Sequence, residues 1–307
     1  MKSKVMVAVV AIVPLLLASG CSISASGIEL GSGPPDFQLH ASSAVGDIPV
    51  NHTARALLPT SIRDSGILRV GGQTSQPPYL QTESGDVTGL ESDFIVSVAR
   101  TLGLEPKMTN TKFISLVPGL ASERFDVVMG NFSDTLVRQQ SVDFVDYAAS
   151  KQTFVVRTDS GTQVSTLDDL CGRSVAGAIG AKSIMLMHDQ SIKCDNAGKR
   201  PLKIKTFPTF ADATLALLNG RVEVIPIDYG LARALVRGTD GKLEIIESFY
   251  GQGLIGVGVR KGESNLADAM QAAFSVLMDN GAYRRILDHW ELQGMSIPEP
   301  VVNGVKK

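Results

Sequence analysis

The chain lacks several features that would mark a particular class of protein. Its 29 basic and 31 acidic residues are scattered without runs of one sign, which gives no site for a polyanion, so nucleic acid is not an expected partner. The histidines form neither a metal-site spacing nor a triad spacing, so no metal and no cofactor is expected; they are His40, His52, His188 and His289. Beyond Cys21 no apolar stretch is long enough to span a membrane.

Length and composition are those of a globular protein with two lobes. With 307 residues, 44% of them apolar and 20% charged, the chain is long enough for each lobe to have its own hydrophobic core. A single small domain is therefore excluded.

Residues 1–20 predict a signal peptide. Lys2 and Lys4 precede an apolar stretch, residues 5–17, which is shorter than the roughly 20 residues of a transmembrane helix and contains Pro14. The segment LASGC that ends at Cys21 resembles the lipobox of bacterial lipoproteins, although it has Ala where Leu is commonest. This resemblance implies that a lipid on Cys21 anchors the chain to the outer face of the bacterial cell membrane. An ordinary secretory signal with a chance cysteine is the alternative.

The other two cysteines predict a disulfide bond. If Cys21 carries lipid, Cys171 and Cys194 form an even pair in an oxidising compartment. A bond between them would stabilise the fold by about 3 to 4 kcal/mol in the chain-entropy model. Two unpaired buried thiols are the alternative.

A flexible tether is expected between the signal peptide and the fold. Residues 21–58 are rich in Gly, Ser, Ala and Pro and show no sustained period of 3.6 or 2. Such a spacer would let a membrane-held protein reach a partner.

From residue 59 on, the pattern alternates between strands and helices. A strand at residues 67–70 leads into a polar loop, and residues 92–102 place their apolar side chains on one helical face before Gly103. The alternation predicts an α/β fold with parallel strands and right-handed crossovers. Ligands of such sheets bind outside the carboxyl ends of the strands.

A candidate anion-binding site follows the buried strand at residues 127–129. A short helical turn opens at residues 133–135, and Arg138 lies one turn in. Unpaired backbone N–H groups at such a strand end, together with the planar fork of an arginine, suit a carboxylate. A loop arginine paired with a surface Asp is the alternative. An earlier strand end presents polar side chains in the same way, namely Gln73, Ser75 and Gln76.

Two further groups lie at predicted strand ends in the second half of the chain. The turn at residues 180–183 offers N–H groups at a helix start, with Lys182 and Ser183 nearby. The strand at residues 222–227 delivers Asp228 to its end, where a carboxylate could hold an ammonium group. A tight connection and a helix cap are the respective alternatives. Together with the site at Arg138, these two groups make two candidate anion-binding sites and one candidate cation-binding site. A free α-amino acid carries the matching carboxylate and ammonium charges.

Several segments carry a family resemblance through their number, order and spacing. They are GILRVGG with PPY, GLESDF, KFISLVPGL, FDVVMGNFSDTLVRQQSVDFVDY, DLCGRSVAGAIGAKS, TLALLNGRVEVIPID, and GVGVRKGE followed by LMDNGAYRRILDHW. Over nearly everything from Leu58 to Gln293 the chain resembles extracellular solute-binding protein family 3, the amino-acid-binding receptors of ABC importers. The resemblance implies the two-lobed, type II periplasmic-binding-protein-like fold, with parallel-rich sheets and a two-strand hinge. Lobe 1 would comprise residues 59–153 and 250–297, and lobe 2 residues 154–249.

The resemblance also assigns ligand contacts by position. Phe113 falls where relatives place an aromatic ring against the ligand. The α-carboxylate contacts fall on Asn131, Ser133 and Arg138. The second-lobe N–H contacts fall on the turn at residues 180–183, and the ammonium contact falls on Asp228. The predicted ligand-binding set is Gln73, Gln76, Phe113, Asn131, Ser133, Arg138, Gly180, Lys182, Ser183 and Asp228. Departures from the family pattern leave side-chain specificity open, namely Gln76, Ala181, Lys182 and Pro226.

The implied mechanism is binding by closure, without a chemical step. Lobe 1 would hold the carboxylate through Arg138 and Ser133 and lobe 2 would supply Asp228, so only a ligand that touches both lobes stabilises the closed form. We expect an extracytoplasmic monomer that delivers an amino acid to the permease of an ABC transporter.

An enzyme of the same fold and a ligand-sensing receptor domain are the alternatives. Some relatives are dehydratases and others are fused to lytic transglycosylase domains, and these need an added carboxylate or an added domain. Residues 177–183 contain no Asp or Glu for general acid work. A receptor would need a transmembrane helix.

Arg138 and Asp228 would bind the carboxylate and the ammonium group of the amino acid, so the ligand side chain would contact the other residues of the site. Its neighbours would be Gln73, Gln76, Tyr79, Glu91, Phe113 and Lys182. Two amides, an aromatic ring and an ammonium suit a polar neutral or acidic side chain, so Gln, Asn, Glu or Asp is expected ahead of Lys, Arg or Leu.

Overall fold

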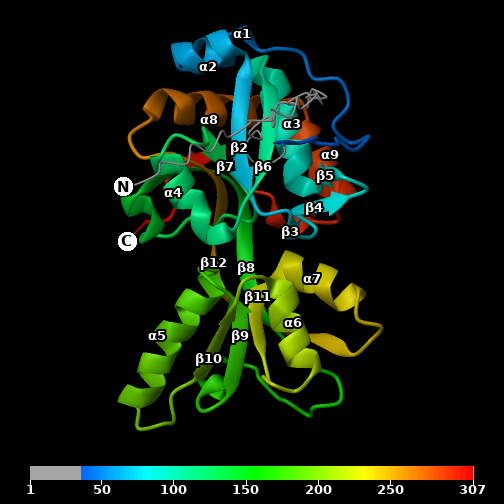
Figure 1. The fold of residues 1–307 in the computed structure, drawn as a ribbon, viewed down its shortest axis with the longest axis vertical. Helices are drawn as coiled ribbons and strands as arrows, with labels where there is room; N and C mark the ends of the chain where they lie inside the picture. The colour runs from blue at the N-terminus through cyan, green and yellow to red at the C-terminus, as the bar shows by residue number, and fades with distance from the viewer. Residues whose placement is uncertain (1–35, 307) are drawn as a thin grey trace, which may run out of the picture. The chain divides into compact units, whose positions relative to one another are not determined.

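The computed structural model describes residues 36–306, which form an α/β fold (Figure 1). The predicted signal peptide, Cys21 and the first part of the predicted tether lie outside the described residues.

A mixed sheet runs through the described residues. In spatial order its strands are β1 (Asp36–Phe37), β6 (Glu105–Asn110), β2 (Ile67–Gly72), β7 (Val127–Val128), β12 (Leu243–Arg260), β8 (Val142–Arg157) and β11 (Ile225–Asp228), with β13 (Val301–Val302) also on β8. β2 pairs in parallel with β6 and β7, whereas β8 and β12 run antiparallel to each other. The parallel strands β6, β2 and β7 therefore lie inside a mixed sheet that is antiparallel at β1 on one side and at β12, β8 and β11 on the other.

Two lobes are built on this sheet. We call the part around β2, β6 and β7 lobe 1, and the part around β9 (Ser174–Ala178), β10 (Lys203–Phe207) and β11 lobe 2 (Figure 1). β9 and β10 pair in parallel, and Val175 of β9 forms a bridge with Val224 just before β11.

Helices and a small sheet complete lobe 1. The helices are α1 (His52–Ala56), α2 (Thr60–Ser65), α3 (Leu90–Leu102), α4 (Leu116–Ala121), α8 (Ser264–Asp279) and α9 (Ala282–His289). The small antiparallel sheet comprises β3 (Ser75–Gln76), β4 (Leu80–Glu83) and β5 (Asp86–Thr88). Short 3₁₀ helices are η1 (Phe113–Ser115), η2 (Arg138–Gln140) and η4 (Gln293–Met295).

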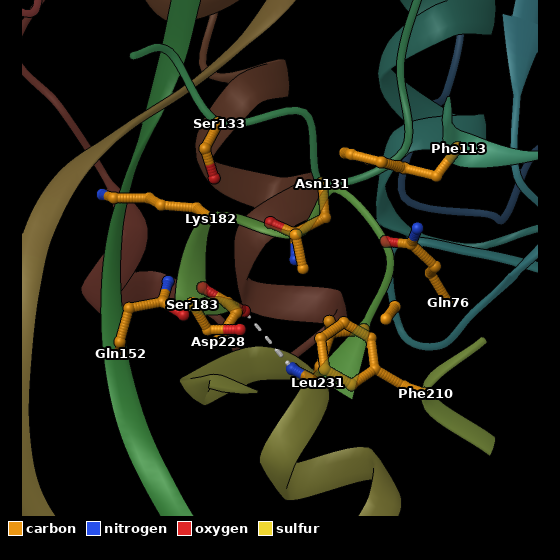
Figure 2. Close-up of a pocket in the computed structure, with 12 residues that line it drawn as sticks. Gln76, Phe113, Asn131, Ser133, Gln152, Lys182, Ser183, Phe210, Asp228 and Leu231 are labelled. Atoms are coloured by element: carbon orange, nitrogen blue, oxygen red, sulfur yellow. Dashed lines mark hydrogen bonds between the residues drawn. The ribbon is translucent and has the colours of Figure 1, made fainter. Parts of the chain in front are cut away.

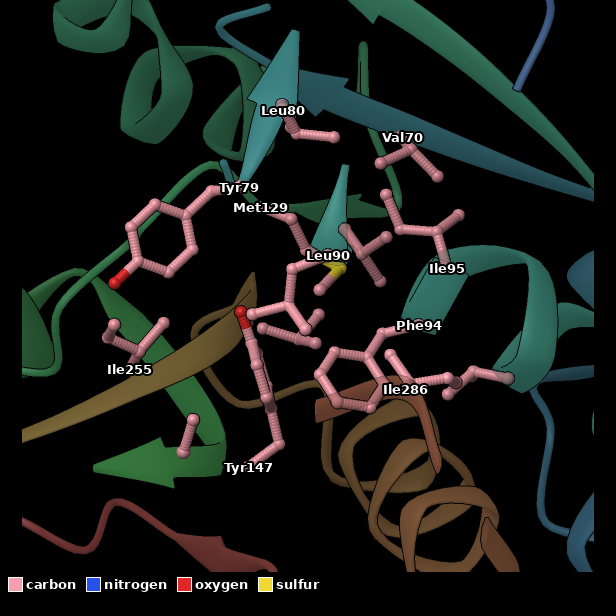
Figure 3. Packing of buried hydrophobic residues seen from close by; sticks show 14 of the residues in the cluster. Val70, Tyr79, Leu80, Leu90, Phe94, Ile95, Met129, Tyr147, Ile255 and Ile286 are labelled. Atoms are coloured by element: carbon pink, nitrogen blue, oxygen red, sulfur yellow. The ribbon is translucent and has the colours of Figure 1, made fainter. Parts of the chain in front are cut away.

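The core of lobe 1 surrounds Phe94 of α3. The Phe94 ring lies 5.3 Å from that of Tyr147 and 5.5 Å from that of Tyr283, measured between centroids. Tyr147 in turn stacks on Phe274 of α8 at 5.0 Å. Figure 3 shows Phe94 and Tyr147 among aliphatic side chains of the strands and helices around them. This packing fixes the strands whose ends carry the site.

Lobe 2 consists of three helices around β9, β10 and β11. They are α5 (Lys182–Asn196), α6 (Phe210–Leu218) and α7 (Tyr229–Arg237), and η3 (Leu167–Leu170) precedes β9. The predicted disulfide is present: Cys171, which follows η3, is bonded to Cys194 of α5. Pro226 lies in β11 at the end of the sheet order, where a missing ladder donor is tolerated.

The hinge consists of β8 and β12, which pass from lobe 1 into lobe 2 (Figure 1). Their pairing has three register shifts, two of which lie where the strands cross between the lobes and one in lobe 1, between Ile255 and Gly256. Register shifts separate the pairs Ile246–Phe154, Tyr250–Gln152 and Gly253–Ser150. The ladder is therefore weakest where the strands cross between the lobes.

The predicted tether differs from the structure at residues 36–58. β1 pairs with β6, and the hydroxyl of Ser42 donates to Asp93 of α3 at 2.6 Å. Val45 and Ala54 are buried against lobe 1. The prediction of a tether is wrong for these residues because their partners are distant in sequence and leave no local periodicity.

Candidate ligand-binding site

A small cavity, about 20 Å³ in volume, lies between the two lobes beside the hinge. From lobe 1 it is lined by Gln76, Phe113, Asn131 and Ser133, and from lobe 2 by Lys182, Ser183 and Asp228. Figure 2 shows these side chains around the same space. The structure therefore brings together seven of the ten residues predicted from the sequence.

Asp228 is held rigidly at the end of β11. It is the N-cap of α7, and its Oδ1 accepts hydrogen bonds from the backbone N–H groups of Gly230 at 2.9 Å and Leu231 at 3.3 Å. The same oxygen accepts a third bond, from the hydroxyl of Tyr79 at 2.5 Å. Burial raises the pKa of Asp228, while these three bonds act to lower it. The helix-cap interpretation is thus correct, and Oδ2 takes part in none of the three bonds.

Arg138 lies behind the cavity wall. Its Nη1 donates to the carbonyl of Ser133 at 2.5 Å, and its Nη2 donates to the carbonyl of Gly180 in lobe 2 at 2.8 Å. The guanidinium carbon also lies 5.2 Å from the ring centroid of Phe113 and 4.8 Å from that of Phe132. Burial lowers the pKa of Arg138 to about 10, so it is charged at neutral pH.

The structure contradicts one of the two sequence interpretations of Arg138. The surface-Asp alternative is wrong, since the guanidinium bonds to carbonyl oxygens and contacts two rings. The expected open fork is also absent from the cavity lining, because the guanidinium spans from Ser133 to Gly180 and links the lobes. Gly180 contributes its carbonyl to this link and does not line the cavity.

The loop after β7 reaches the cavity through an unusual backbone path. Gly130 has φ 122°, a value that side chains rarely allow, and Asn131 follows with φ 51°. The N–H of Asn131 donates to Oε1 of Glu91 at 2.8 Å, which fixes the turn. Oδ1 of Asn131 is buried and has no hydrogen-bond partner among the described residues.

Glu91 of α3 supports this loop through its bond to Asn131. It is fully buried, and its Oε1 also accepts a bond from the hydroxyl of Tyr147 at 2.5 Å. Burial raises the pKa of Glu91 to about 7, against the opposing effect of these bonds. Glu91 is thus a structural neighbour of the site, as its position in GLESDF indicated.

The start of α5 brings Lys182 and Ser183 to the cavity. The Nζ of Lys182 donates to the carbonyl of Gly251 in β12 at 2.8 Å, and Figure 2 shows the side chain extending toward the hinge strands. Burial lowers the pKa of Lys182. Oγ of Ser183 is buried and unpaired among the described residues.

Gln73 lies behind Gln76 and outside the cavity lining. The Nε2 of Gln76 donates to Oε1 of Gln73 at 3.2 Å, and Gln73 donates to Oγ of Ser75 at 3.1 Å. Gln73 therefore orients Gln76, whose amide points toward Phe113 on the same side of the cavity (Figure 2).

Sequence reasoning missed three larger side chains of the cavity. They are Gln152 of β8, Phe210 at the start of α6 and Leu231 of α7. Phe210 is the first residue of α6, inside the capping box of Thr209 and Asp212 and three residues beyond the end of β10, so the strand-end rule applied to β10 would have found it. Gln152 lies inside a long hinge strand and has no comparable signal.

A metal site and a membrane-spanning helix are two features that the described residues lack. Among residues 36–306 no group of three or more His, Cys, Asp or Glu side chains is arranged to hold a metal ion. No helix in this part of the chain combines the length and the apolar character needed to cross a bilayer.

The sequence model of the bacterial extracellular solute-binding proteins, family 3, matches residues 68–293. The chain belongs to this family. The matched range includes every predicted ligand-binding residue from Gln73 to Asp228.

Two family-3 relatives and one solved structure illustrate the similarity. The chain is 26% identical to the arginine-binding protein ArgT of Corynebacterium glutamicum, over 81% of this chain and 82% of the relative. It is also 26% identical to the L-cystine-binding protein TcyJ of Escherichia coli, over 81% of this chain and 92% of the relative. The crystal structure of the substrate-binding protein of an amino acid ABC transporter matches with a TM-score of 0.65 at 26% identity, covering 73% of this chain and 98% of that one.

The predicted fold class is confirmed. The chain has the two-lobed type II fold of periplasmic amino-acid-binding proteins, with a two-strand hinge. These named relatives are binding proteins.

Proposed function

We propose that the chain is an extracytoplasmic substrate-binding lipoprotein that captures an amino acid between its lobes and delivers it to an ABC transporter permease. The lobes would be residues 59–153 with 250–297, and residues 154–249. Family membership supports solute binding, and the relatives support an amino acid as the class of ligand.

The observation that carries the proposal is the pre-oriented carboxylate of Asp228 at the cavity. Three hydrogen bonds to Oδ1 fix its position, and Oδ2 is left over for a ligand ammonium group. The unpaired Oδ1 of Asn131 is a second acceptor on the same cavity. An ammonium group would therefore be bound by one carboxylate of lobe 2 and one amide of lobe 1.

The ligand carboxylate would replace the carbonyl oxygens of Ser133 and Gly180 as the hydrogen-bond acceptor of Arg138. In the structure the guanidinium bonds to two neutral carbonyls, and a carboxylate is a stronger acceptor for the same fork. Oγ of Ser183 and the N–H groups at the start of α5 would complete the carboxylate site. A cavity of about 20 Å³ holds about one water molecule, so the lobes must part to admit an amino acid.

We propose a polar neutral or acidic side chain for the ligand. The cavity wall offers the amides of Gln76 and Gln152, the ring of Phe113 and the ammonium of Lys182. Glu91 does not line the cavity, and burial raises its pKa to about 7, so it is a poor partner for a cationic side chain. Relatives named for arginine make a cationic side chain the main competitor.

A thermal-shift panel of the twenty amino acids and cystine tests this proposal. A ligand at 100 times its dissociation constant stabilises by about 2.7 kcal/mol, which raises the melting temperature by roughly 5 to 10 °C for lobes of this size. We expect Gln, Asn, Glu or Asp to give the largest shift. A shift with Arg or Lys alone would overturn the side-chain assignment, and shifts only with sugars or peptides would overturn the amino-acid assignment.

The lipid anchor rests on the LASGC segment alone and needs its own test. We expect the Cys21→Ser chain to be released from the membrane or left unprocessed, whereas the natural chain partitions into detergent. A Cys21→Ser chain that stays in the detergent phase with normal mature mass would refute the anchor. The monomeric state is proposed with it and is checked by the mass of the mature chain in solution.

An enzymatic role has less support than binding. Asp228 is the carboxyl of the cavity lining, and its three hydrogen bonds serve the fold, as do the two that Glu91 accepts behind Asn131. The side chains of the cavity otherwise comprise amides, hydroxyls, apolar groups and Lys182. We propose that the chain binds its ligand without converting it, and recovery of unchanged amino acid from the complex is the check.

A further inference from the structure

The C-terminal residues 303–306 lie against the hinge strand β8. The N–H of Asn303 donates to the carbonyl of Phe144 at 3.0 Å, and Oδ1 of Asn303 accepts from the N–H of Phe144 at 2.9 Å. The next N–H, that of Gly304, donates to Oδ2 of Asp146 at 2.7 Å. These bonds continue the pairing of β13 with β8 beyond the strand itself.

The same residues bond to the ligand-binding loop, residues 131–138. The N–H of Val305 donates to Oδ2 of Asp134 at 3.1 Å. Nε2 of Gln139 donates to the carbonyl of Val305 at 2.9 Å and to both carboxylate oxygens of Asp134 at 2.8 Å. The backbone of Val305 is thus paired on both its N–H and its C=O with side chains next to the loop.

The loop has little secondary structure of its own and depends on such contacts. Its backbone is tied to β12 by the N–H of Asp134, which donates to the carbonyl of Leu254 at 3.0 Å, and by a bridge between Ser133 and Ile255. Its only regular element is the one-turn helix η2, which begins at Arg138. Short 3₁₀ turns are weak, so tertiary bonds hold the loop in place.

Asp134 and Asp146 form the buried centre of this arrangement. Asp134 is 1% exposed and Asp146 is not exposed. Burial, with the charge of Asp134 as the next cause, raises the pKa of Asp146 to about 8, so Asp146 is largely protonated near neutral pH. The charged groups that act on the pair are Lys306 from the C-terminal residues, Arg138 from the loop and Lys182 from α5.

We propose that residues 303–306 are a strap that holds the ligand-binding loop against the hinge, with Asp134 as the positioning residue. The strap joins β8 at Phe144 and Asp146 to the loop at Asp134. It thereby sets the position of Ser133 and Arg138, which the proposed function places on the ligand carboxylate. The inference about affinity rests on that proposed function, whereas the inference about the loop does not.

Variants of the full mature chain test the strap. Gln139→Ala removes the bonds to Val305 and Asp134 without adding atoms, and Gln140→Ala is the matched control because Gln140 is exposed. Gly304→Val is a second variant, since even a Cβ at this position would lie 2.5 Å from Cδ1 of Leu254 and 2.8 Å from Oδ2 of Asp146. If Gly304→Val fails to fold, Gln139→Ala still decides the question.

Hydrogen exchange without ligand gives the first readout. We expect the amides of residues 131–141 to exchange about tenfold faster in Gln139→Ala than in the natural chain, with the amides of β2 unchanged. Gln140→Ala should exchange like the natural chain. Equal exchange in the loop of Gln139→Ala and the natural chain would overturn the strap.

Affinity for L-glutamine and its pH profile give the second readout. We expect the dissociation constant to be about tenfold larger in Gln139→Ala. In Gln140→Ala it should change by less than about twofold. In the natural chain, affinity should fall at alkaline pH when Asp146 loses its proton beside Asp134, and Asp146→Asn should remove this fall. A loosened loop with unchanged affinity and pH profile would overturn the positioning role.

The two readouts separate the strap from the proposed function. If the natural chain binds neither L-glutamine nor any other of the twenty amino acids, the proposed function fails while exchange still decides the strap. If the natural chain binds and the loop exchanges equally in all variants, the strap fails alone.

Discussion

The hydroxyl of Tyr79 in lobe 1 donates a 2.5 Å hydrogen bond to Oδ1 of Asp228 in lobe 2. Both side chains are buried and belong to different lobes, so separation of the lobes would break this bond. We predict that Tyr79→Phe weakens amino-acid binding about tenfold, because a hydrogen bond to a charged group contributes about 1.5 kcal/mol. Isothermal titration with the amino acid that gives the largest thermal shift measures the change.

Tyr250→Phe is the control for this experiment. Tyr250 is also buried, but its hydroxyl has no hydrogen-bond partner among the described residues, so its removal should leave affinity unchanged. Equal affinities in both variants would mean that the bond of Tyr79 does not contribute to closure.

Arg138→Ala should abolish measurable amino-acid binding while the chain still folds. The substitution removes the proposed carboxylate partner and also the bond to the carbonyl of Gly180 that links the lobes. Losing one partner of a buried charged hydrogen bond costs roughly 2 to 5 kcal/mol, or about 30-fold or more in affinity. Titration and circular dichroism measure binding and folding.

Arg124→Ala is the matched control for Arg138. Arg124 is exposed, and its guanidinium lies 5.0 Å from the ring centroid of Phe125, so it has a similar ring contact away from the cavity. We expect natural affinity. A folded Arg138→Ala chain with natural affinity would show that the carboxylate binds elsewhere.

Stability should rise as the pH is lowered from 8 to 5. The folded chain raises the pKa of Glu91 to about 7 by burial, and burial also raises the pKa values of Asp228 and Asp146. Between the ordinary carboxyl range and about pH 7 the folded state binds more protons than the unfolded state, so stability falls as pH rises. The shift of Glu91 alone corresponds to roughly 3 kcal/mol. Carboxyls with lowered pKa values, such as Asp143, have the opposite effect on stability, but only at pH values below this window.

Melting temperatures at pH 5 and pH 8 measure this effect. Glu91→Gln keeps the shape of the side chain without its titration and should reduce the difference, whereas Glu83→Gln, at an exposed position, should not. A natural chain that melts higher at pH 8 than at pH 5 would contradict the assignment.

The disulfide between Cys171 and Cys194 should contribute to stability and leave binding intact. It spans a separation of 23 residues, for which the chain-entropy model gives about 3 kcal/mol. The double Cys171→Ser, Cys194→Ser chain should therefore melt several degrees lower and bind its amino acid normally below the transition. Free thiols in the denatured, unreduced natural chain would contradict the bond.

Much of the fold was predictable because its elements carry local signals. The helix expected at residues 92–102 is α3, bounded by Gly89 and by Gly103 at φ 64°. The strand ends at Asn131 and Asp228 were found because small polar residues follow buried apolar runs. Seven of the ten expected residues then met at one cavity, since strand ends of an α/β sheet lie on the same edge.

What was missed depends on contacts between distant residues. The side chain of Arg138 points to the carbonyl of Gly180, a choice set by the second lobe and not by the loop sequence. Residues 36–58 lack periodicity, yet β1 and Ser42 find partners in β6 and α3. Neither relationship leaves a pattern in adjacent residues, so sequence reasoning could not reach it.

The register shifts of the hinge give its two strands unequal lengths of backbone. Between the pairs Ile246–Phe154 and Gly253–Ser150, β12 takes seven residue steps (246 to 253) while β8 takes four (154 to 150). Surplus backbone can straighten when the lobes separate, whereas β8 is already extended. We therefore expect opening to be a rotation about β8 during which β12 lengthens. A stiffer β12 would slow the capture and release of ligand without altering any residue that touches it.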